Sequence, residues 1–139
     1  MGIDREVVAS LSRGHRVLTD SLGPSSGIVE SSDHMKQKAV AIFEKAAAHF
    51  SLQSKELFDA LKVFFVEDRE SLKKIEFLEN DLKSIKVAAW TFFEEYSGEL
   101  KIFKGGNFHK DLNILRTELV DRIRSEKQFL IPLLDQFFG

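Results

Sequence analysis

Apolar residues recur every three or four positions along most of the chain, which is the spacing of one buried helix face. Neither glycine nor proline occurs between Gly27 and Gly98, and most residues there are good helix formers. The predicted helices span residues 4–21, 33–65, 69–97 and 109–138. Four helices with one apolar face each can bury those faces together, so the sequence predicts an all-α, up-down-up-down four-helix bundle. A single domain over residues 1–139 is expected.

Polar residues at the helix ends suggest where the chain turns. The glycines and proline of "GPSSG", residues 23–27, end the first helix. Asp68 or Ser71 can cap the third helix, and Ser51 leaves open a break in the second helix near "HFSLQS". Pro132 lacks a backbone N–H and is expected to bend the last helix.

Two charged residues interrupt the apolar face of the last helix. At helical spacing this face contains Leu112, Leu115, Leu119, Arg122, Glu126, Leu130, Leu133 and Phe137. Arg122 and Glu126 therefore point toward the core. Because an unpaired buried charge costs several kcal/mol, on the order of what a whole fold gains, we expect the two charges to compensate each other. Polar residues also interrupt the other helices, and the predicted core polar cluster consists of Gln53, Lys86, Arg122 and Glu126.

Composition excludes several classes of function. The 20 basic residues are interspersed with 22 acidic ones and the net charge is -2, which leaves no electrostatic footprint for nucleic acid. The chain has no cysteine, no signal-peptide pattern and no apolar stretch that approaches a membrane span, so cytoplasm is the expected location. We find no metal-spaced histidine pair, no nucleophile elbow and no phosphate loop, so no catalytic residue is assigned and an enzyme is not expected.

At these polar positions the chain resembles the hemerythrin-like family, whose four-helix bundles hold a non-haem di-iron site with histidine and carboxylate ligands. "HFSLQSKELFDAL", residues 49–61, is similar to the second-helix motif of the family, and "RIRSEKQFLIPLL", residues 122–134, is similar to the fourth-helix motif. "GHRVL" resembles the opening histidine motif, and "DLKSIK" matches the third helix. The resemblance implies the same fold for nearly the whole chain.

The metal-ligand set that this resemblance implies is incomplete. Gln53 stands where the family has a bridging glutamate, and Leu82 and Arg122 stand where it has histidines. The ligand-type residues that remain are His15, His49 and Glu126. A guanidinium group is always protonated and repels a metal ion, so we expect no cofactor and read Arg122 as the electrostatic replacement for iron beside Glu126.

The sequence leaves three hypotheses about function open. The first is a regulatory or protein-interaction module with an unidentified protein partner, and Phe137 and Phe138 at the C-terminal tip would then form a partner or homodimer interface. The second is an oxygen or redox sensor or carrier that holds non-haem iron on His15, His49 and Glu126. The third is a histidine phosphotransfer bundle that uses His15, although Leu18 occupies the position where such domains have a lysine.

Overall fold

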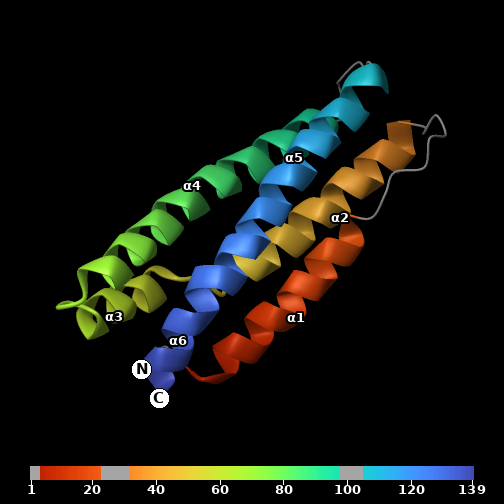
Figure 1. Cartoon of the computed structure of the whole chain (residues 1–139). Helices are drawn as coiled ribbons and strands as arrows, with labels where there is room; N and C mark the ends of the chain where they lie inside the picture. The colour runs from red at the N-terminus through yellow and green to blue at the C-terminus, as the bar shows by residue number, and fades with distance from the viewer. Residues whose placement is uncertain (1–3, 23–31, 98–104) are drawn as a thin grey trace.

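A computed structural model describes residues 4–22, 32–97 and 105–139, and these residues form an all-α structure (Figure 1). The α-helices are α1 (Glu6–Ser21), α2 (Ser32–Phe50), α3 (Lys55–Phe64), α4 (Arg69–Ser97), α5 (Gly105–Ser125) and α6 (Ile131–Phe138), and a π-helical segment, η1 (Glu126–Leu130), joins α5 to α6. The predicted fold class, all-α, is therefore confirmed. The turn predicted at residues 23–27 lies outside the described residues.

Four helical columns surround one hydrophobic core. Helix α1 packs against α2, α2 against α4, and α4 against α5, while α6 contacts both α1 and α3. Neighbouring columns run in opposite directions in Figure 1. The core contains apolar residues from every α-helix, as the apolar spacing of the sequence predicts.

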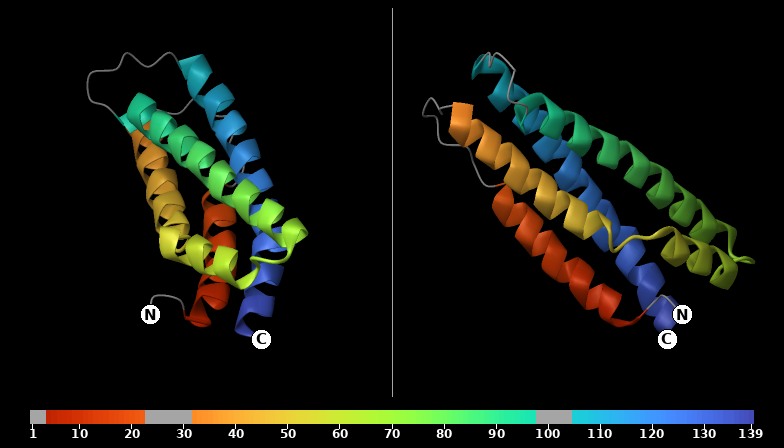
Figure 2. Two further views of the ribbon diagram at one scale, coloured as in Figure 1. Left: turned by 90° about the vertical axis from the view of Figure 1, so that its left-hand side faces the viewer. Right: turned by 180° about the vertical axis from the view of Figure 1, so that it is seen from behind.

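The second predicted helix is interrupted. It is predicted over residues 33–65 with a break left open near "HFSLQS", and the break occurs there: α2 ends at Phe50 and α3 begins at Lys55. The side chain of Ser54, rather than that of Ser51, caps the new helix by accepting a hydrogen bond of 3.2 Å from the backbone N–H of Leu57. Figure 2 shows α3 as a separate short helix beside the first turns of α4.

The last column changes helix type just before Pro132. Proline has no N–H for the carbonyl group four residues earlier, and its ring crowds that carbonyl. The chain adopts the π-helical turn Glu126–Leu130 immediately before α6, which has this proline in its first turn. Where the sequence predicts a bend, the structure has a π-helical turn, and Glu126 is its first residue.

Asp68 caps α4, one of the two residues that the sequence offered for this role. Its carboxylate accepts a hydrogen bond of 3.2 Å from the backbone N–H of Ser71 and one of 2.8 Å from the hydroxyl group of Ser71.

None of the helices in the described part of the chain is long and apolar enough to cross a membrane.

Candidate functional site

The polar residues of the core converge on the carboxylate of Glu126, which has no exposed surface. Oε1 accepts hydrogen bonds from Nε2 of His15 on α1 and Nε2 of His49 on α2, each at 2.7 Å. Oε2 accepts one from Nε2 of Gln53, in the turn between α2 and α3, at 2.8 Å, and one from Nε of Arg122, one helical turn away, at 2.8 Å. Four donors from separate parts of the chain thus surround one carboxylate.

The remaining donors of Arg122 extend this cluster to α4. Its Nη2 group donates to Oε1 of Gln53 at 2.6 Å. Its Nη1 group donates to the backbone carbonyl of Leu78 at 2.8 Å and to Oδ2 of Asp81 at 3.1 Å. Arg122 is 1% exposed, so its charge is compensated inside the protein rather than by water.

The structure brings together three of the four residues predicted for the core polar cluster: Gln53, Arg122 and Glu126. Lys86 was expected there as well, and this was wrong, because its side chain is exposed on α4. A long charged side chain at the edge of a helix face more readily extends into water. Asp81 takes the corresponding role on α4, with a side chain that is 35% exposed.

Hydrogen bonding keeps Glu126 ionised. Burial alone would raise the pKa of its carboxyl group. The hydrogen bonds from His15 and His49, together with the positive charge of Arg122, outweigh burial and hold the pKa of Glu126 well below its ordinary value. The carboxylate and the guanidinium therefore form a buried ion pair at neutral pH.

The two histidines each have one bonded and one unbonded ring nitrogen. In both rings Nε2 faces Glu126, whereas Nδ1 is buried and has no hydrogen-bond partner among the described residues. The rings lie against each other with centroids 4.9 Å apart. A ring nitrogen that donates to a carboxylate carries a proton, so Nε2 of each ring is the donor toward Glu126.

Histidine packing explains a glycine inside α1. A Cβ atom on Gly14 would lie 2.2 Å from Nδ1 and 3.0 Å from Cε1 of His49. Any side chain at this position would collide with the ring, so the absence of a Cβ lets α1 approach α2 closely.

A metal ion fits this arrangement poorly, although the ligand atoms of His15, His49 and Glu126 all lie within 4.8 Å of one another. A metal on the two Nε2 atoms would move each ring proton to Nδ1, and metal-bound histidines normally donate that proton to an acceptor. Neither Nδ1 has an acceptor within the described residues. Arg122 also places a fixed positive charge 2.8 Å from Oε2 of the same carboxylate.

The burial of His15 bears on the phosphotransfer hypothesis. Its side chain is 3% exposed, and its Nε2 is bonded to Glu126. Phosphoryl transfer between proteins needs a histidine that a partner can reach. The geometry of His15 therefore gives this hypothesis no support.

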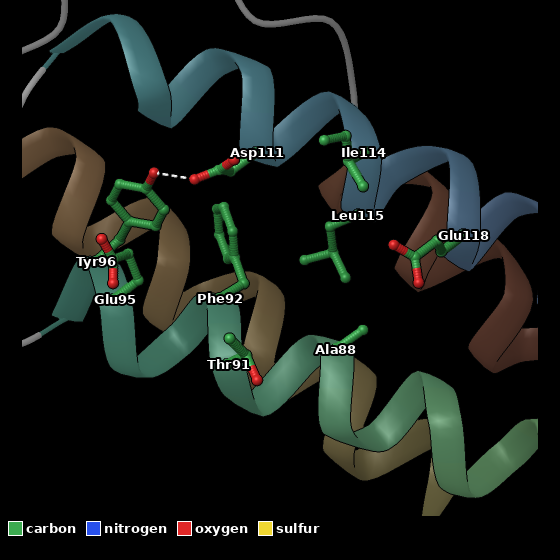
Figure 3. Close-up of a pocket in the computed structure, with 9 residues that line it drawn as sticks. All are labelled: Ala88, Thr91, Phe92, Glu95, Tyr96, Asp111, Ile114, Leu115 and Glu118. Carbon is green, nitrogen blue, oxygen red and sulfur yellow. Dashed lines mark hydrogen bonds between the residues drawn. The ribbon is translucent and has the colours of Figure 1, made fainter.

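Two surface cavities between helices contain none of the residues of the Glu126 cluster. A cavity of about 370 Å³ between α4 and α5 has an apolar floor that includes Phe92 and Leu115 (Figure 3). Three carboxylates line it, those of Glu95, Asp111 and Glu118, and the hydroxyl group of Tyr96 donates a hydrogen bond to Asp111. A second cavity, of about 270 Å³, lies between α2 and α4.

Comparison with known proteins identifies no relative: no protein-family model matches the chain, and no curated protein or solved structure matches it significantly.

Proposed function

We propose that this protein is a non-enzymatic interaction module of the hemerythrin-like type, in which a hydrogen-bonded ion pair takes the place of a metal centre. The observation that carries the proposal is that the carboxylate of Glu126 is fully hydrogen-bonded. Each of its two oxygens accepts two hydrogen bonds, and one of these four bonds comes from the positively charged side chain of Arg122. Polar groups that compensate one another fix the packing of helices. Because all of these groups are already bonded to one another, they have little capacity for chemistry. We keep cytoplasm as the proposed location.

The competing proposal is a non-haem iron protein that uses His15, His49 and Glu126, which is favoured only by the convergence of their ligand atoms. We expect protein from iron-supplemented cells to contain far less than one iron per chain and to lack a visible absorption band. Its melting temperature should be the same before and after dialysis against a chelator, because a structural metal adds directly to the free energy of unfolding.

One variant distinguishes the two proposals further. Replacing His49 with glutamine keeps a donor toward Glu126 but removes an imidazole ligand. Stoichiometric iron in the unaltered protein that is lost in His49→Gln would contradict the ion-pair proposal and establish the metal one. Metal-free protein that melts at the same temperature with and without chelator would eliminate the metal proposal.

The apolar end of the molecule supports an interaction role. Val63 is 75% exposed, Phe64 is 52% exposed and Val66 is 66% exposed. The ring of Phe64 packs against that of Phe137 on α6, with centroids 5.2 Å apart. Phe138 is half-buried, and the side chain of Arg5 lies near its ring and its carbonyl oxygen. The apolar end therefore consists of Val63, Phe64, Val66 and Phe137, and α3 contributes more to it than the C-terminal tip does.

We expect the apolar end to mediate a homodimer, because contiguous exposed aromatic and aliphatic side chains favour association. Light scattering on concentrated protein should give a mass near twice the 15.9 kDa of the chain. Phe64→Ser should shift the mass toward that of one chain. Phe77→Ser is the matched control, since Phe77 is 47% exposed on α4 and lies outside the apolar end. A monomer at all concentrations, or equal loss of dimer in both variants, would show that the apolar end does not mediate self-association.

A further inference from the structure

The cavity between α2 and α4 contains none of the residues of the Glu126 cluster. Its lining consists of Phe43, Ala47, Phe50, Ser51, Lys86, Ala89 and Trp90. A volume of about 270 Å³ corresponds to about nine molecules of liquid water, which suits a small organic molecule rather than a single ion.

Two aromatic side chains fix the shape of this cavity. The ring of Phe43 lies edge-on to Trp90, with centroids 5.4 Å apart, and stacks on Phe93 at 4.5 Å. Trp90 nevertheless remains 47% exposed. A rigid aromatic wall that still contacts water can bury more apolar surface when a ligand occupies the cavity.

A single cation lies at this apolar cavity. Lys86 is exposed and forms no hydrogen bond or ion pair with any residue that the structure describes. The residues three and four positions away on α4 are Leu82, Lys83, Ala89 and Trp90, so its own helix offers no carboxylate. The hydroxyl group of Ser51 already donates a hydrogen bond to the carbonyl of Ala48, at 2.7 Å. Lys86 is therefore the side chain in the lining that has donors available for a ligand.

This combination selects one class of ligand. The apolar part of such a ligand would pack against the apolar walls of the cavity, and one negatively charged group would pair with the ammonium group of Lys86. The α4–α5 cavity of Figure 3 has the opposite character, since its three carboxylates would repel an anion. We propose that the α2–α4 cavity binds a small monocarboxylate with an apolar chain, which places its carboxylate beside Nζ of Lys86 and its chain against the wall formed by Phe43 and Trp90.

Trp90 is the only tryptophan of the chain, so its fluorescence reports directly on this cavity. Titration of the full chain with octanoate should shift the emission to shorter wavelength and saturate with a Kd of about 1 mM or tighter. Octan-1-ol, which has the chain without the charge, should bind about tenfold more weakly. Octylamine should produce no saturable shift.

Three variants test the assignment of the site. Lys86→Met keeps an unbranched side chain and should weaken octanoate binding about tenfold while leaving octanol binding unchanged. Lys83→Met is the matched control, because Lys83 is exposed on the same helix but does not line the cavity, and it should bind as the unaltered protein does. Ala47→Leu should fill the cavity and abolish the shift with either ligand.

The proposal is overturned if octanoate leaves the Trp90 emission unchanged, if the alcohol binds as tightly as the carboxylate, or if Lys86→Met and Lys83→Met weaken binding equally. Because the substituted side chains are exposed, circular dichroism should show the same helix content in all variants. The test does not depend on the absence of metal from the core, so it can fail while the proposed function stands.

Discussion

Replacing Arg122 with methionine is expected to lower the free energy of unfolding by about 3–5 kcal/mol. Methionine fills much of the same volume but leaves the carboxylate of Glu126 without its buried countercharge. It also leaves Oε1 of Gln53 without its donor. Urea unfolding followed by circular dichroism measures the difference, because its midpoint falls in proportion to the lost stability when the slope is unchanged.

Arg124→Met is the matched control for this prediction. Arg124 lies two residues further along the same helix, with a side chain that is 69% exposed and that pairs, among the described residues, only with the exposed Asp121. Its removal should change the free energy of unfolding by less than about 0.5 kcal/mol. Equal effects of the two substitutions would mean that the buried ion pair does not compensate Glu126.

The pH dependence gives the same prediction a second readout. The pKa of Glu126 is lowered in the folded state, so its stabilising effect is complete above the pKa of the unfolded chain and is lost as the pH falls through the folded value. Removing the charge of Arg122 should raise the pKa of Glu126 in the folded state. The stability difference between the two proteins should therefore be largest near neutral pH and should narrow in acid.

The positions of Arg122 and Glu126 were accessible from the sequence because both lie on an otherwise apolar stripe of the last helix. Helical spacing alone places them in the core, and two adjacent opposite charges can compensate each other. The all-α fold class follows from the same periodicity.

Other parts of the cluster could not be predicted from side-chain spacing. Asp81 lies beside the apolar stripe of α4 and reaches Arg122 from its edge, whereas Lys86, at a similar edge position, extends into water. The carbonyl of Leu78 is a backbone group and has no signal in the sequence. The sequence left a break after Phe50 open, but it offered Ser51 as the cap, whereas Ser54, the other serine of "HFSLQS", caps the new helix.

The π-helical turn was predictable only as a disturbance. Pro132 removes one backbone donor, which predicts a bend, but a missing donor does not indicate that the helix takes in an extra residue. In the structure this disturbance begins at Glu126, the residue on which the cluster converges. Packing against the other three columns decides between the alternatives, and that information is not local to the helix.

Gly14→Ala is expected to destabilise the protein by about 1–3 kcal/mol, although alanine is the better helix former by about 1 kcal/mol. The new Cβ atom would lie 2.2 Å from Nδ1 of His49. The ring cannot retreat freely, because its Nε2 donates to Glu126. Either the hydrogen bond lengthens or α1 moves away from α2, and both changes weaken the cluster. Thermal and urea unfolding of the purified variant measure the net effect.

The background His49→Ala isolates the cause of this effect. Without the imidazole ring the added methyl group has room, so Gly14→Ala should there be neutral or stabilising through helix propensity alone. The four proteins form a double-mutant cycle whose coupling free energy reports the contact between the two positions. A rise in the unfolding midpoint for Gly14→Ala in the unaltered background would contradict the close approach of α1 to His49. The sign of this one substitution therefore tests whether the glycine is required by the histidine cluster or is an ordinary helix defect.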